Sequence, residues 1–173
     1  MAAAGWDADL DPGLDQFGHR QAVDVRDQLA SIECRTVVVS PFRRCQETAV
    51  PLAALWGIVP MVESAVAEIP SPDGVSMSDR VEWLRTAMRG TWSDLGPRYT
   101  TFRDGVVGAL LRMPSDTVVF SHFVAINAVI GAAIGDDRLV IRSLDNCSVT
   151  VVDVIDGQLH FVEGGQEGDT LIR

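Results

Sequence analysis

One short segment limits the possible folds more than any other. The run Thr36-Val37-Val38-Val39 is continuous and β-branched, as in a parallel strand that is buried on both faces. Ser40 is a good helix N-cap and Pro41 suits the first helical position, so we expect a helix from Pro41 to Trp56. Arg43 and Arg44 would then lie in the first turn, where unpaired N–H groups and the helix dipole favour an anion.

A second strand-to-helix junction has the same form. Thr117-Val118-Val119-Phe120 reads as a strand, and Ser121-His122 follows it directly, ahead of a helix that we expect to reach about Ile134. Ligands of open α/β sheets bind at the carboxyl ends of the strands. An arginine and a histidine at two such ends therefore indicate a site for phosphoryl transfer.

The remaining sequence alternates helical and extended patterns. Helices are expected at about 15–31, 78–89 and 97–112, and strands at 58–62, 148–154 and 158–162, the last two joined by an Asp156-Gly157 turn. This order predicts an α/β fold: a three-layer sandwich with a mostly parallel mixed sheet flanked by helices, ending in a β-hairpin. At 173 residues we expect a single domain. The residues after Gly164 are expected to be loose.

Composition and charge exclude several classes of protein. The sequence has neither an apolar stretch long enough to cross a bilayer nor the features of a signal peptide, so we expect a cytoplasmic protein without a membrane partner. A net charge of −10 argues against nucleic-acid binding. All 14 basic residues are arginine, which excludes a P-loop lysine and a Schiff-base lysine. The cysteines are too few and too scattered for a disulfide framework or a zinc site: Cys34, Cys45 and Cys147.

Four segments together resemble a known enzyme family. They read, in chain order, Asp11-Pro12-Gly13-Leu14-Asp15-Gln16-Phe17-Gly18-His19-Arg20-Gln21-Ala22, then Ser40-Pro41-Phe42-Arg43-Arg44-Cys45-Gln46-Glu47-Thr48-Ala49, then Val118-Val119-Phe120-Ser121-His122, then Asp145-Asn146-Cys147-Ser148-Val149-Thr150. The second is similar to the arginine signature of the histidine phosphatase superfamily, the phosphoglycerate-mutase-like proteins. The resemblance covers nearly the whole chain in the family's order.

This resemblance implies a phosphomonoester hydrolase that needs no metal or other cofactor. In the family a histidine attacks phosphorus and forms a phosphohistidine, which water then hydrolyses, while cationic groups stabilise the transition state and a carboxylic acid protonates the leaving alkoxide. Arg44 matches the phosphate-binding arginine, and His122 matches the second histidine, which contacts the transferred phosphate. Glu68 stands where relatives place the acid, with Asp73 as a nearby rival. The stretch at about 70–112 corresponds to the family's lid.

The family's nucleophile is not found in the sequence. Relatives begin with an apolar strand ending in Arg-His-Gly or Arg-His-Ala, whereas residues 1–14 are a loop-like stretch rich in Ala, Asp, Gly and Pro. We therefore expect the nucleophilic histidine upstream of Met1, and we expect the chain as printed to lack phosphatase activity. The alternative is that the nucleophile has truly been lost.

Other candidate residues have simpler explanations. His19 is expected on a helix surface and His160 in the terminal hairpin, and we reject both as the missing nucleophile. Arg43 can pair with Glu47 one turn along the helix, and Cys45 falls on the apolar side of that helix. Further residues are assigned to packing or to loops: Trp83, Trp92, Tyr99, Asp136 and Asp137.

Two other functions remain open. One is a non-catalytic relative that holds a phosphorylated ligand through Arg44 and His122, and the other is a phosphoglycerate-type mutase. The short lid favours a phosphatase over a mutase by analogy. The expected partner is a small phosphorylated substrate, and the oligomeric state is left open.

Overall fold

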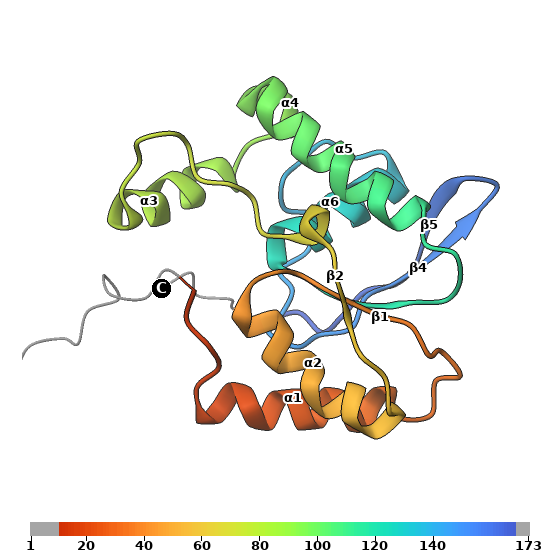
Figure 1. Cartoon of the computed structure of the whole chain (residues 1–173). Coiled ribbons are helices and arrows are strands. Elements are labelled where there is room, and N and C mark those ends of the chain that lie inside the picture. The colour runs from red at the N-terminus through yellow and green to blue at the C-terminus, as the bar shows by residue number, and fades with distance from the viewer. Residues whose placement is uncertain (1–10, 169–173) are drawn as a thin grey trace, which may run out of the picture.

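A parallel sheet of three strands, with helices on both of its faces, forms the centre of the computed structural model, which describes residues 11–168 (Figure 1). The sheet order is β2-β1-β3, and a separate antiparallel pair, β4-β5, follows. The elements are α1 (Gln16–Leu29), β1 (Val37–Val39), α2 (Arg43–Trp56), β2 (Met61–Val62), the 3-10 turn η1 (Ser64–Val66), α3 (Met77–Ala87), α4 (Trp92–Leu95), α5 (Pro97–Leu111), β3 (Val118–Phe120), α6 (Phe123–Ile134), β4 (Val151–Ile155) and β5 (Gln158–Glu163). The expected α/β class, parallel sheet and terminal hairpin are confirmed.

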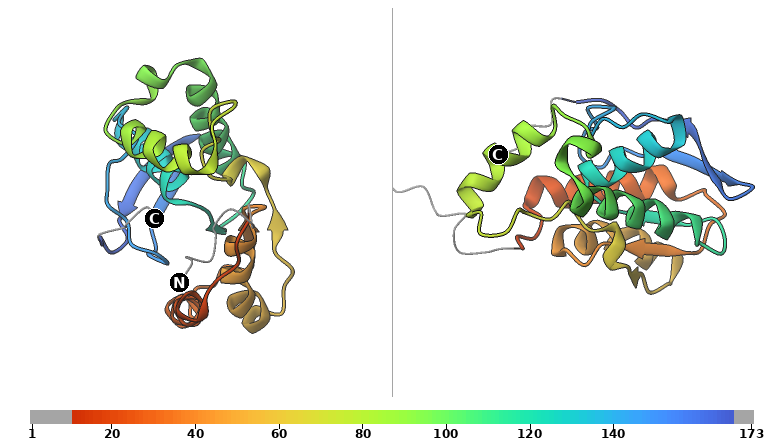
Figure 2. Two further views of the ribbon diagram at one scale, coloured as in Figure 1. Left: turned by 90° about the vertical axis from the view of Figure 1, so that its left-hand side faces the viewer. Right: turned by 90° about the horizontal axis from the view of Figure 1, so that it is seen from above.

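Strand β1 is the buried centre of this arrangement. Its three valines are each 2% exposed, as expected for a strand covered on both faces. Val37 and Val39 pack with Leu52 in the core cluster formed with α1 and α2, whereas Val38 packs on the opposite face with Val66 and Ala109. The views from the side and from above show α1 and α2 on one side of the sheet and α5 on the other (Figure 2).

Helix α2 begins two residues later than the sequence suggests. Phe42 is its N-cap and has no side-chain cap hydrogen bond, whereas Ser40 was expected in that role. The Ser40 hydroxyl instead accepts from the Phe42 N–H at 3.3 Å and contacts His122. The two arginines still occupy the first turn, and Gly57 ends the helix in a left-handed conformation, as expected.

The short helix α4 was missed because its sequence is too short to show a period. Thr91 and Asp94 form a capping box at its start, and Trp92 within it is fully buried. Trp83 and Tyr99 lie in the same core cluster, with ring centroids 5.5 Å apart. The prediction that these aromatic residues serve packing is therefore confirmed.

The terminal hairpin forms a sheet of its own. Among residues 11–168, β3 pairs only with β1 and β4 pairs only with β5. The stretch leading into β4 nevertheless lies near β3, because Cys147 and Val149 pack against the core cluster that contains Phe120. The expected strand at 148–154 is shifted, since pairing starts at Val151 next to a bulge. The expectation of a loose tail is wrong for its described part, where Glu167 forms a β-bridge with Leu144.

A buried amide fixes the loop that follows α6. The Asn127 side chain is fully buried, donates to the carbonyls of Phe123 and Arg142, and accepts from the N–H groups of Ile141 and Arg142. These four contacts stand in for backbone pairing that the loop does not make. Within residues 11–168 every helix is too short or too polar to cross a lipid bilayer.

We expect Asn127→Leu to lower the free energy of unfolding by about 2–4 kcal/mol, because it leaves several backbone groups buried without partners. Urea unfolding monitored by circular dichroism measures this change. Asn146→Leu, at an exposed position, is the control and should stay within about 0.5 kcal/mol of the parent. Equal stability of the two variants would show that Asn127 does not hold the loop.

Candidate functional site

The carboxyl ends of β1 and β3 bring residues from distant parts of the chain together. The two strands run parallel with Val39 opposite Phe120, and the Ser40 N–H donates to the Phe120 carbonyl at 2.9 Å. The helices that follow both start at this edge, so Arg44 in the first turn of α2 lies beside His122, the N-cap of α6. This is the edge where α/β sheets bind ligands.

Both ring nitrogens of His122 have polar partners. Nδ1 lies 3.0 Å from Nη2 of Arg44, and Nε2 lies 2.7 Å from the hydroxyl of Ser40. The imidazole is only 6% exposed, and the ring of Phe42 meets it edge-on at 5.3 Å. The Arg44 guanidinium also lies over the Phe42 ring, 4.6 Å from its centroid. The orientation of the imidazole is thus fixed from several sides.

His122 is neutral at physiological pH in this arrangement. Burial, together with the positive charges of Arg44 and Arg80, lowers its pKa to about 3. Cys45 lies against the same ring, with Sγ 3.5 Å from Nε2, and donates to the carbonyl of Ser121 at 3.3 Å. Burial raises the pKa of the Cys45 thiol to about 12, so it is a packing thiol, as predicted, and not a nucleophile.

Glu68 follows η1, and its carboxyl keeps its proton to a higher pH than usual. Its residue keeps some exposed surface, but the carboxyl itself is enclosed, and burial raises its pKa to about 7. The carboxylate accepts from the Ile69 N–H at 2.9 Å, and the charges of Arg80 and Arg44 act in the opposite direction on its pKa. The rival Asp73 is exposed and forms an ion pair with Arg98 at 2.9 Å.

Two charged groups at the site were not anticipated. Asp11 places its carboxylate at the start of α2, where it accepts from the Arg43 N–H at 2.9 and 3.0 Å, and it lies 3.9 Å from the Arg44 guanidinium. Arg80 of α3 donates to the Ile69 carbonyl at 2.9 Å and to the Ser71 hydroxyl at 2.8 Å. Arg80 could not be found from the sequence, because only the folded loop brings it beside Glu68.

Most other candidate residues lie where the sequence suggests. His19 and His160 are both exposed, and Arg43 pairs with Glu47 at 2.7 Å. Asp136 forms an ion pair with Arg138, and Asp137 forms one with Arg103. Among residues 11–168, no group of three or more acidic, cysteine or histidine side chains is arranged to hold a metal.

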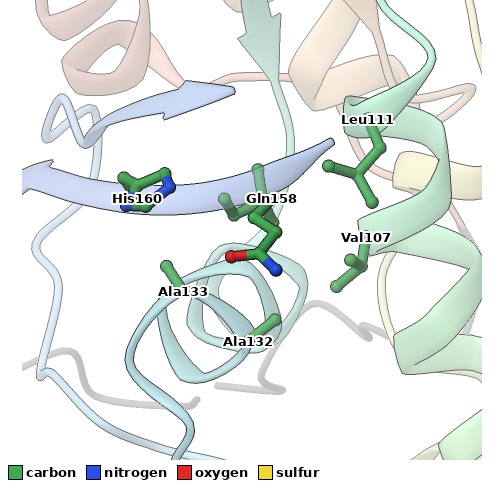
Figure 3. Close-up of a pocket in the computed structure, with 7 residues that line it drawn as sticks. Val107, Leu111, Ala132, Ala133, Gln158 and His160 are labelled. Carbon is green, nitrogen blue, oxygen red and sulfur yellow. The ribbon is translucent and has the colours of Figure 1, made fainter. Parts of the chain in front are cut away.

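A shallow pocket of about 310 Å³ lies elsewhere on the molecule (Figure 3). Its walls come from α5, α6 and β5, with Val107, Ala133 and His160 among the labelled side chains. None of Arg44, Glu68 and His122 lines it. Its lining is mainly aliphatic and carries no cluster of groups able to do chemistry.

Comparison with known proteins places this geometry in context. The sequence profile of the histidine phosphatase superfamily, branch 1, matches residues 3–166. No curated protein matches the chain at the level of sequence.

Several solved structures share the fold. A mycobacterial glucosyl-3-phosphoglycerate phosphatase is 21% identical, with a TM-score of 0.70 over 92% of this chain and 90% of its own. It has also been solved with inorganic phosphate, with a TM-score of 0.65 and 19% identity over 91% of this chain and 89% of its own. Bacillus stearothermophilus YhfR is 21% identical, with a TM-score of 0.74 over 94% and 88%. The alpha-ribazole phosphatase of Shigella flexneri is 16% identical, with a TM-score of 0.71 over 90% and 86%.

The raised pKa of Glu68 predicts a pH-dependent stability. The folded protein binds this proton more tightly than the unfolded chain does, so stability should fall as pH rises from about 4.5 through about 7. Glu68→Gln removes this dependence, and we expect the variant to be more stable than the parent by about 3 kcal/mol at about pH 8 and equal to it at about pH 4. Urea unfolding at both values measures the difference. The exposed Glu82→Gln is the control, and a parallel pH profile for all three proteins would contradict the assignment.

Proposed function

Because the chain belongs to the histidine phosphatase superfamily, branch 1, we propose that it binds a small phosphomonoester at the edge formed by Ser40, Arg44 and His122 and that its site hydrolyses the ester through a phosphohistidine. The observation that carries this proposal is the direct contact of Arg44 with His122, beside a carboxyl whose pKa is raised to about 7. The fold neighbours whose names state an activity are phosphatases of two different phosphomonoesters, so the proposal leaves the alcohol part open.

Each residue has a role that its surroundings support. Arg44, at the positive end of α2, would neutralise the charge that spreads over the equatorial oxygens of the transferring group. His122, which contacts Arg44, would bind another oxygen of the same phosphoryl group. Glu68, protonated near neutral pH, would give its proton to the leaving alkoxide as the bond from phosphorus to that oxygen breaks. The resulting carboxylate would then take a proton from the water that attacks the phosphohistidine, which releases phosphate and restores the acid.

The attacking histidine must come from outside the three histidines of the sequence. His122 is held by two partners within the site, while His19 and His160 are exposed, on the surface of α1 and in the terminal hairpin. We propose that the nucleophile lies on an apolar strand upstream of Met1. Its place would be between β3 and β4, whose facing edges make no backbone hydrogen bonds to each other among the described residues.

The packing of β3 supports that position. Val118 and Val119 are only half-buried, whereas the three valines of β1 beside them are each 2% exposed. In β4, Val151, Val154 and Ile155 are 39%, 48% and 50% exposed. Parallel strands in α/β sheets are normally covered on both faces, and long apolar edges tend to acquire a pairing strand. An additional strand would cover both of these edges at once.

A non-catalytic function is the second candidate, and the lack of a nucleophile in the sequence favours it. In that case the chain would bind phosphorylated ligands through Arg44 and His122 without turnover. A mutase would instead move phosphate within its substrate and release none.

We expect Arg44→Ala to weaken the binding of inorganic phosphate about 100-fold, because it removes charge-assisted hydrogen bonds worth about 2–3 kcal/mol. Isothermal titration calorimetry measures the affinity. The matched control is Arg43→Ala, whose side chain pairs with Glu47 outside the site and which should change the affinity less than about threefold. Similar losses in both variants would mean that phosphate binds through general surface charge.

The position of the nucleophile is tested with a polypeptide that begins upstream of Met1. If the genomic sequence encodes, in frame, an apolar strand ending in Arg-His, we expect the extended protein to hydrolyse p-nitrophenyl phosphate and the printed chain to leave it intact. Rapid quenching into alkaline denaturant, in which phosphohistidine survives, should trap the label on the added histidine. A stop codon directly upstream, or equal inactivity of both proteins with phosphate still bound, would favour the binding function.

A further inference from the structure

The hydrogen bonds of His122 determine which of its nitrogens carries the proton. A guanidinium has donors only, so Nδ1 at 3.0 Å from Arg44 must accept. In a neutral imidazole the single proton is therefore on Nε2, which donates to the Ser40 hydroxyl at 2.7 Å. Nδ1 thus carries a lone pair, which accepts from Arg44 at the place where an anion would bind.

The unprotonated oxygens of an oxyanion also present lone pairs, so they cannot hydrogen-bond to Nδ1 in this state. A hydrogen bond between them requires a proton on Nδ1. We propose that the site binds a tetrahedral oxyanion together with one proton, which is carried at Nδ1 of His122, and that Ser40 is the positioning residue that keeps Nε2 protonated in both states. This inference rests on the proposed function only in placing phosphate at this edge of the sheet.

The charge of the bound anion determines where the proton on Nδ1 comes from. When a dianion such as sulfate or an ionised phosphate monoester binds, one proton comes from the solvent, a new N–H bond forms at Nδ1, and the ring becomes an imidazolium. The hydrogen bond from Arg44 to Nδ1 breaks in this step, and both groups then donate to the anion. A phosphate monoanion brings this proton with it. The added positive charge on the ring then lies against the bound dianion, which compensates for the burial that otherwise keeps the ring neutral.

Ser40 is suited to this role by its position. It is fully buried, and its oxygen accepts the N–H of Phe42 at 3.3 Å, which leaves a second lone pair for Nε2. The other groups around the ring are Arg44, Phe42 and Cys45 of the β1–α2 segment, and Arg80 of α3 acts through its charge. Every charged group among these disfavours an imidazolium in the empty site. A bound anion would reverse that balance.

The competing arrangement predicts a different result. If the Ser40 hydroxyl reversed and donated to Nε2, the neutral ring could move its proton to Nδ1 without gaining one. Anion binding would then take up no proton. The two possibilities are therefore distinguished by counting protons and by observing both ring nitrogens.

The first experiment uses the unaltered protein labelled with ¹⁵N-histidine. In the free protein at about pH 8, NMR should show His122 with a protonated Nε2 and a bare Nδ1, and saturating inorganic phosphate should protonate both nitrogens. Calorimetry of sulfate binding in two buffers of different ionisation enthalpy should give an uptake of about one proton per site. A bare Nδ1 or a bare Nε2 in the phosphate complex, or an uptake near zero, would overturn the inference.

The second experiment tests the role of Ser40. We expect Ser40→Ala to weaken phosphate binding about tenfold and to lower the pH at which the bound His122 loses its proton by about one unit, since the imidazolium loses an acceptor. Ser121→Ala is the matched control, because its hydroxyl donates to the Val66 carbonyl at 2.7 Å and does not contact the ring. A merely structural role of Ser40 would reduce stability and leave the pH of that transition unchanged, which would also overturn the inference.

These outcomes can be told apart from failure of the proposed function. A protein that binds phosphate with a doubly protonated His122 but never forms phosphohistidine, even with an upstream strand, would retain this inference and lose the phosphatase. A protein that hydrolyses the ester with a neutral His122 throughout would do the reverse. No phosphate binding at all would contradict both.

Discussion

The whole site depends on the parallel register of β1 and β3. Because Val39 lies opposite Phe120, the two chains leave the sheet at the same level, and the Ser40 N–H continues the pairing by one further hydrogen bond to the Phe120 carbonyl. That bond places the Ser40 side chain beside His122. A shift of one residue in either strand would turn the side chains that follow it toward the opposite face of the sheet and separate the two.

Burial is the common cause of the unusual protonation of this site. It raises the pKa of the Glu68 carboxyl and lowers that of the His122 imidazole, so both groups tend toward their neutral forms near pH 7. The guanidinium groups of Arg44 and Arg80 act on both through their positive charge, and the Asp11 carboxylate at the start of α2 lies beside Arg44. A chain with a net charge of −10 thus gathers positive charge at one place, and that charge acts locally because short-range groups outweigh distant surface charges.

The two sheets give the molecule a structural asymmetry. Strand β1 has a partner on each side and is closely covered, whereas β3 and β4 have apolar side chains and a partner on one side only, within residues 11–168. The strand proposed to carry the nucleophile would lie between these two edges. The site residues on the β1 side are already held by packing and hydrogen bonds, so they need no additional strand to be oriented toward one another.

Local sequence was sufficient for the elements and for their order. A run of valines, a Ser-Pro junction and a histidine after a second strand predicted the parallel sheet, and the arginine signature predicted the family, since these patterns depend only on neighbouring residues. Local sequence gave Ser40 as a helix cap, missed α4 and did not single out Arg80, because those roles depend on what lies across the sheet or the loop. The contact of Arg44 with His122 spans 78 residues of sequence. Pairing over such a distance, and the burial that sets the protonation of both His122 and Glu68, exist only after the strands have aligned, and so only the tertiary structure decided them.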